Sequence, residues 1–214
     1  MEKLFNKDLQ KQIGEFLTHM KNNVTLVLFI GEKNCETCEQ TKMLLEEVSE
    51  LNDKITLEVK DIVKDSDEAL KYGVTMVPSF VMLDNEGHYQ GVKFNGIPAG
   101  HEINSFLSAV IDMSGAEFIK DKALIERIKK IDKPVNIKVF VTLSCPHCPG
   151  AVSNAHRLAM LNANIESEMI EAQTFYELST KYSVSGVPKI VINETHELVG
   201  NQPIEEYLKT LENL

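Results

Sequence analysis

Short apolar runs alternate along this chain with longer segments in which apolar residues recur every three or four positions. Residues 25–30 and 135–143 are apolar and rich in β-branched residues, which is typical of buried strands. A helical pattern follows each run, marked by Met43, Leu44, Val48 and Leu51 and by Val152, Ala155, Leu158 and Ala159. Each part of the chain therefore begins with a predicted strand and a predicted helix.

The remaining elements follow in the same order in both parts. Further strands are predicted at 55–59, 79–83, 165–170 and 189–193, helical segments ending at Tyr72 and Tyr182, and closing helices at 102–111 and 203–211. Residues 84–87 indicate a hairpin turn, and amphipathic stretches at 9–17 and 124–131 precede the two parts. The pattern predicts an α/β fold made of two tandem units, each a mixed sheet flanked by helices.

An internal repeat supports this division. Cys35 lies 43 residues before Pro78, and Cys145 lies 43 residues before Pro188, so both landmarks are offset by 110 residues. The Lys-Tyr step at 71–72 recurs at the same offset. We place the boundary near residues 113–115, which predicts units at 1–113 and 114–214.

Composition excludes several classes of protein. Hydrophobic residues make up 43% of the chain and charged residues 25%, as in ordinary globular proteins. The formal net charge of −10 argues against a nucleic-acid partner. No apolar run approaches the roughly 20 residues that a membrane span needs, and residues 1–8 show no signal-peptide pattern. We therefore expect a cytoplasmic protein without a membrane partner.

The four cysteines form two Cys-x-x-Cys pairs, each placed where a strand leads into a helix. A helix N-terminus stabilises negative charge, so the first cysteine of each pair should be available as a thiolate. Cys35 and Cys145 are the expected nucleophiles. Cys38 and Cys148, one turn later, are the expected resolving thiols.

Zinc binding and inert structural cysteines are the alternatives to redox chemistry. Zinc ribbons usually space their cysteine pairs by roughly 15–20 residues, whereas about a whole unit separates these two pairs. We expect no bound metal and no bound cofactor.

The residues between the cysteines differ between the two pairs. Pro146 suits the first turn of a helix, and His147 can stabilise a neighbouring thiolate. The first pair instead lies among three acids, Glu32, Glu36 and Glu39. If these carboxylates disfavour the Cys35 thiolate, the second pair is the more oxidising, and electrons pass from the first pair to the second. If they are solvated, their effect is small.

Two Val-Pro steps precede apolar strands, Val77-Pro78 and Val187-Pro188. Proline is disfavoured inside strands, so the repeated step indicates either a special backbone or an ordinary turn. A cis bond would place the valine backbone beside the cysteines, where it could pair with an extended substrate segment.

The repeated layout from Cys-x-x-Cys to Val-Pro resembles the thioredoxin superfamily. Two units in one chain resemble the glutaredoxin-like protein disulfide oxidoreductases of archaea and bacteria. This resemblance implies that each unit is thioredoxin-like, that Pro78 and Pro188 are cis, and that Val77 and Val187 contact the substrate backbone. The family's buried acid is missing, because Phe29 and Val139 occupy its position. The other candidates to accept a proton are Glu58, Asp61 and Glu168.

The leading functional hypothesis is an enzyme that reduces, oxidises or isomerises protein disulfides, recharged by a separate thioredoxin-reductase-like flavoprotein. A second hypothesis is an electron carrier between such a flavoprotein and a peroxiredoxin, similar to the N-terminal domain of alkyl hydroperoxide reductase flavoproteins. A third, from a different class, is a chaperone or redox-sensing module without turnover.

Overall fold

The computed structural model describes residues 3–32 and 35–214. The first half contains α1 (Lys7–Leu17), β1 (Val24–Ile30), α2 (Cys38–Ser49), β2 (Ile55–Asp61), α3 (Ser66–Lys71), β3 (Ser79–Leu83), β4 (Tyr89–Asn95), the 3-10 helix η1 (Gly100–Glu102) and α4 (Ile103–Met113). The second half contains α5 (Lys122–Lys129), β5 (Val135–Val141), α6 (Cys148–Leu161), β6 (Ile165–Glu171), α7 (Tyr176–Lys181), β7 (Lys189–Ile192), β8 (His196–Val199) and α8 (Ile204–Leu211). The predicted strands and helices are confirmed to within a few residues.

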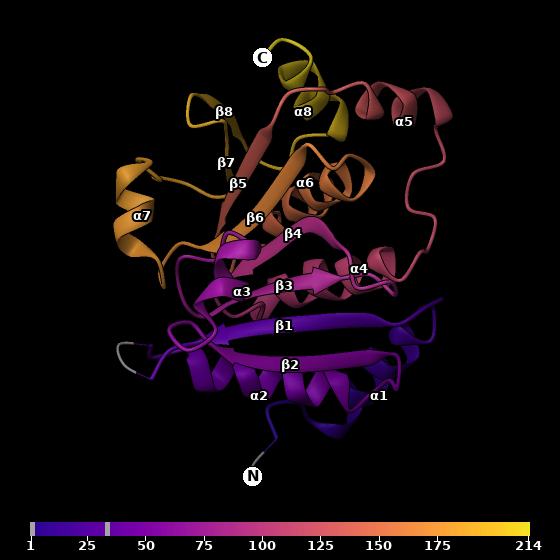
Figure 1. Ribbon diagram of the computed structural model, residues 1–214, viewed down its shortest axis with the longest axis vertical. Helices are drawn as coiled ribbons and strands as arrows, with labels where there is room; N and C mark the ends of the chain where they lie inside the picture. The colour runs from indigo at the N-terminus through magenta and orange to yellow at the C-terminus, as the bar shows by residue number, and fades with distance from the viewer. Residues whose placement is uncertain (1–2, 33–34) are drawn as a thin grey trace.

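All eight strands belong to one sheet, in the order β2-β1-β3-β4-β6-β5-β7-β8 (Figure 1). Within each half, two parallel strands are followed by an antiparallel hairpin. The halves are joined because β4 pairs in parallel with β6, from Val92–Asn95 to Ser167–Ile170. The α/β fold of two tandem units is confirmed, but the two sheets that we expected are continuous. The boundary at residue 113 stays a prediction.

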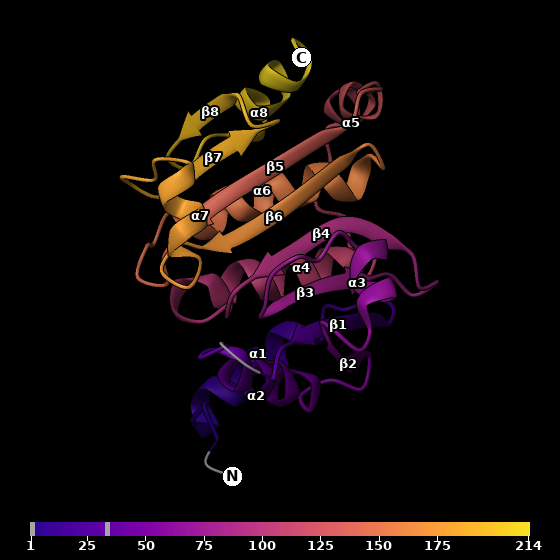
Figure 2. The ribbon, with the colours of Figure 1, turned by 60° about the vertical axis from the view of Figure 1, so that its left-hand side comes forward.

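The helices cover the two faces of the sheet unequally (Figure 2). One face carries α3 and α7. Ala69 of α3 belongs to one small apolar cluster, and Leu178 of α7 packs against another. The other six α-helices contribute to a single large core on the opposite face, which runs through both halves. None of the helices in the described part of the chain has the length and apolar character that a bilayer crossing requires.

The junction between the halves is closely packed. A Cβ atom on Gly91, which has a φ of 73°, would lie 2.4 Å from the carbonyl oxygen of Ile165, so only glycine fits there without rearrangement. On the helical face, Arg157 Nε donates to Asp112 Oδ2 at 2.7 Å, linking α6 to α4. These contacts fix the two halves relative to each other.

Two candidate redox centres

Each Cys-x-x-Cys pair forms a disulfide at the start of a helix. The Cα atoms are 5.4 Å apart in Cys35–Cys38 and 5.5 Å apart in Cys145–Cys148. Helices α2 and α6 begin at the second cysteine of each pair, so the first cysteine lies in the turn before the helix. Cys35 is half-buried, whereas the other three cysteines are buried. The nucleophile predicted for each pair therefore lies at the positive end of a helix.

The Val-Pro step of the second unit lies beside its cysteine pair. The Val77–Pro78 and Val187–Pro188 peptide bonds are cis. In the second centre, Cys145 Sγ lies 3.8 Å from the carbonyl oxygen of Val187. The structure thus brings together the cysteine and the valine that the sequence places 42 residues apart.

The acids around the first pair are solvated. Glu36 and Glu39 are exposed, and the Glu32 carboxylate, also exposed, pairs with Lys64 Nζ at 2.5 Å. Exposed and ion-paired charges act weakly on a neighbouring sulfur. The geometry therefore favours the interpretation in which the glutamates have little effect on Cys35. Pro146 and His147 are both exposed beside the second pair.

Both centres open at the same edge of the sheet, because β1 and β5 run in the same direction (Figure 1). Strands β3, β4 and β6 lie between them. Four steps of about 4.8 Å between neighbouring strands separate β1 from β5 by roughly 19 Å. Thiol–disulfide exchange requires contact between sulfur atoms. Electrons cannot pass directly between two centres held in this way, so transfer between them needs another molecule.

The three acids predicted as proton acceptors do not fit that role. Glu58 is exposed on β2. The Asp61 carboxylate accepts the backbone N–H groups of the following turn, which lowers its pKa. Glu168 is buried and accepts hydrogen bonds from the side-chain amides of Asn95 and Asn136, at 3.0 and 2.8 Å. None of these three combines burial with a free carboxyl oxygen.

A fourth acid, Glu102, combines burial with a free carboxyl oxygen. Its side chain is fully buried, and its Oε1 atom has no hydrogen-bond partner in the described structure. Its Oε2 atom accepts a hydrogen bond from the Ser105 hydroxyl. Burial raises the Glu102 pKa to about 7, although the Ser105 hydrogen bond opposes this shift. The carboxyl can therefore gain or lose a proton near neutral pH.

The Glu102 segment lies against the second centre, although it belongs to the first half. Helix η1 packs against α6, and the backbone N–H of His101 donates to the carbonyl of Leu143 at 2.9 Å. A Cβ atom on Gly100 would lie 2.3 Å from that same oxygen, so the approach requires glycine. Leu143 precedes Cys145 by two residues. Glu102 thus lies next to a residue that contacts the loop carrying Cys145.

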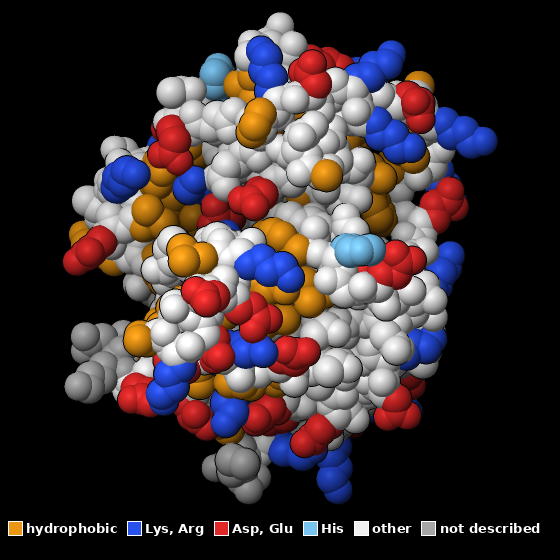
Figure 3. All heavy atoms as spheres, in the orientation of Figure 1, with side chains coloured by type: hydrophobic (Ala, Val, Ile, Leu, Met, Phe, Trp, Pro, Cys, Tyr) orange, Lys and Arg blue, Asp and Glu red, His pale blue; other side chains and the backbone are white. Residues whose placement is uncertain are grey.

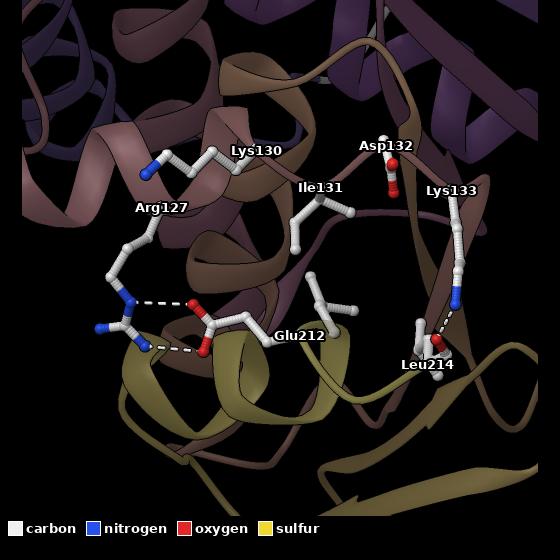
Figure 4. Close-up of a pocket in the computed structure, with 8 residues that line it drawn as sticks. Arg127, Lys130, Ile131, Asp132, Lys133, Glu212 and Leu214 are labelled. Atoms are coloured by element: carbon white, nitrogen blue, oxygen red, sulfur yellow. Dashed lines mark hydrogen bonds and ion pairs between the residues drawn. The ribbon is translucent and has the colours of Figure 1, made fainter.

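A pocket away from the cysteine pairs lies at the ends of α5 and α8 (Figure 4). Its lining residues include no cysteine. Arg127 forms two hydrogen bonds to the Glu212 carboxylate across this pocket, and Lys133 Nζ donates to the carbonyl of Leu214. These contacts attach α8 to the rest of the second half. In residues 3–32 and 35–214, no cluster of three or more potential metal ligands occurs.

Comparison with known proteins assigns the family. A model of the thioredoxin domain matches residues 23–108 and 135–213, which together make up most of the chain. The chain belongs to the thioredoxin domain family and carries two copies of the domain.

Relatives match nearly the whole chain. The alkyl hydroperoxide reductase protein AhpF of Staphylococcus aureus is 29% identical over 208 residues, and the match covers 97% of this chain but only 38% of that protein. The structure of AhpF from Enterococcus faecalis superposes with a TM-score of 0.92 at 31% identity, covering 98% of this chain and all of that one. A protein disulfide oxidoreductase from Aeropyrum pernix gives a TM-score of 0.90 at 32% identity, covering 97% of this chain and 92% of the other.

Proposed function

We propose that this chain is a thiol–disulfide oxidoreductase that passes electrons to protein disulfides through its two Cys-x-x-Cys centres. The observation that carries the proposal is the second centre. There, a disulfide at the start of a helix lies against the carbonyl of Val187 in a cis Val-Pro step. This arrangement presents a reactive sulfur and a backbone segment to the same extended substrate.

The reaction begins from the dithiol form of the centre. The Cys145 thiolate attacks one sulfur of the substrate disulfide, which forms a mixed disulfide and releases the first substrate thiolate. The Cys148 thiol then loses its proton, and its sulfur attacks Cys145 Sγ, which releases the second substrate thiolate. The substrate gains two electrons and leaves as two thiolates, which take up protons from solvent, while the Cys148 proton passes to an acceptor in the protein. The centre is left as the Cys145–Cys148 disulfide seen here. Cys35 and Cys38 perform the same steps in the first centre, where Val77 and Pro78 hold the substrate.

Glu102 is the proposed proton acceptor for the second centre. The Cys148 sulfur is fully buried, so its proton needs a local acceptor before the sulfur can attack. A carboxyl with a pKa of about 7, in a segment that contacts the loop before Cys145, meets this need. His147 and Pro146 are exposed and contribute at the substrate side of the same centre.

The relatives support a choice of partners. The match to the alkyl hydroperoxide reductase protein AhpF supports a flavoprotein reductase of the thioredoxin-reductase type as electron donor, and a peroxiredoxin disulfide as acceptor. The match to a protein disulfide oxidoreductase supports a broader set of protein disulfides. The same proposal places the protein in the cytoplasm, where paired cysteines more often serve redox chemistry than structural bonds.

The test is reduction of insulin disulfides with dithiothreitol as electron source. The unsubstituted protein should accelerate turnover, and Cys145→Ser should remove the larger share of the rate if the second centre dominates. Cys35→Ser measures the share of the first centre. A protein with all four cysteines replaced by serine is the control. Equal rates with this control and with the unsubstituted protein would rule out the enzyme and leave the chaperone or redox-sensing hypothesis.

A further inference from the structure

A groove of about 560 Å³ lies beside Met76, and the second half of the chain forms most of its wall. It is lined by Met76, residues 174–178 and Lys181. Met76 immediately precedes the cis Val77–Pro78 step, whereas residues 174–175 precede α7 and residues 176–178 belong to it. The groove therefore joins the substrate-contacting segment of one unit to a helix of the other.

The wall of this groove is apolar and open to solvent. Tyr176 is 72% exposed and belongs to none of the apolar clusters of the described core. Phe175 and Leu178 are partly buried against the cluster beneath α7. Figure 3 shows hydrophobic side chains at the surface around α7. Glu177 and Lys181 carry opposite charges at the same groove, which gives it no net charge.

The backbone of Val77 adjoins Met76 at the groove. Among the described residues, neither the N–H nor the C=O of Val77 makes a hydrogen bond to another backbone group. A strand-like peptide that pairs with such a segment gains affinity from its main chain, and pockets for its side chains set specificity. Because side chains alternate along a strand, every second residue of a peptide paired with this segment faces the same side.

We propose that this groove is a side-chain subsite of the first centre, which binds a large apolar residue of the protein segment whose disulfide reacts with Cys35. The inference rests on the proposed function and adds the substrate preference of this centre. In the second centre Gly186 occupies the position of Met76, and a Cβ atom at Gly186 would meet nothing within 4 Å among the described residues.

The test uses a Cys145→Ser/Cys148→Ser protein, in which only the first centre reacts. The substrates are two peptide disulfides whose cysteine is flanked on both sides by Phe or by Gly, with dithiothreitol as reductant. The rate with the protein that lacks all four cysteines is subtracted. We expect kcat/KM to be about tenfold higher for the Phe peptide, the discrimination typical of an apolar pocket.

Substitutions in the groove should remove this preference. Met76→Ala together with Tyr176→Ala should bring the Phe-to-Gly ratio of kcat/KM below about two. Leu70→Ala is the matched control, because Leu70 is also an exposed apolar residue, on α3, but does not line the groove. It should retain the full ratio.

The outcomes separate the two proposals. Equal turnover of both peptides, or a ratio that survives the double substitution, overturns the subsite and leaves the redox function in place. Turnover of neither peptide overturns the redox activity of the first centre together with its subsite.

Discussion

Replacing Glu102 by glutamine should make the protein more stable at pH 8 and leave its stability almost unchanged at pH 4. Glutamine has the shape of the glutamic acid but cannot ionise. The folded protein holds the Glu102 carboxyl with a pKa of about 7, against an ordinary value of 4.5. The folded state therefore keeps a proton that the unfolded chain releases, and stability falls as the pH rises from about 4.5 to 7.

The size of the effect follows from this shift. One pKa unit corresponds to about 1.4 kcal/mol. The rise of the Glu102 pKa from 4.5 to about 7 therefore costs roughly 3 kcal/mol of stability at a pH where Glu102 is ionised in both the folded and the unfolded protein. Glu102 is fully buried, so solvent does not screen this cost. Between pH 5 and pH 8 the unsubstituted protein should lose about 2–3 kcal/mol more than Glu102→Gln.

Urea unfolding of the oxidised proteins at pH 4, 5, 6, 7 and 8 measures this difference. Both disulfides stay closed, so no cysteine titrates, and every other titrating group is common to both proteins. Ser105→Ala is an informative companion, because it removes the hydrogen bond that lowers the Glu102 pKa and should steepen the loss above pH 7. Parallel stability curves for the unsubstituted protein and Glu102→Gln would refute a raised pKa at this position.

Three further predictions concern the junction between the halves. His156 is buried, and burial lowers its pKa to about 3. The free energy of unfolding should therefore fall by about 1 kcal/mol per pH unit as the pH drops below 6.5. His156→Gln should flatten this slope in urea unfolding at pH 4–7. In thermal melts, Gly91→Ala should lower the free energy of unfolding by more than about 3 kcal/mol. Gly87→Ala should lower it by about 1–2 kcal/mol, because Gly87 has a similar positive φ but open space where a Cβ atom would lie. Arg157→Ala leaves the Asp112 carboxyl buried without its partner and should cost about 3 kcal/mol of stability at pH 7. The cost should be smaller at pH 4, where Asp112 can take up a proton, because burial raises its pKa. An equal cost at both pH values would contradict this reasoning.

The order of elements and the cysteine centres could be predicted because both depend on local sequence. Strand runs and helical periodicity repeat at the 110-residue offset together with the Cys-x-x-Cys pairs and the Val-Pro steps. The pairing of β4 with β6 could not be predicted in this way. An edge strand and a central strand of a half-buried sheet can share one hydrophobic pattern, so the pattern does not predict which strand pairs with which. The close approach at Gly91 is visible only once the halves are joined.

Glu102 was missed for the same reason. A single acid before a helix is ordinary in a sequence, because negative charge is favoured at a helix N-terminus. Only the contact between η1 and α6 distinguishes Glu102 from a surface acid. The repeated positions Glu58 and Glu168 show this dependence on context directly. One is exposed on an edge strand, whereas the other is buried, because β4 covers β6.

The continuous sheet also gives each centre a part from the opposite unit. Segment η1 with Glu102, from the first half, contacts the loop before Cys145, while the groove at Met76 takes its α7 wall from the second half. Two identical units joined by a flexible linker would have neither feature, because their surroundings would be solvent. Fusion through β4 and β6 thus makes two copies of one motif chemically different. It also holds them roughly 19 Å apart, so electrons do not pass directly from one centre to the other.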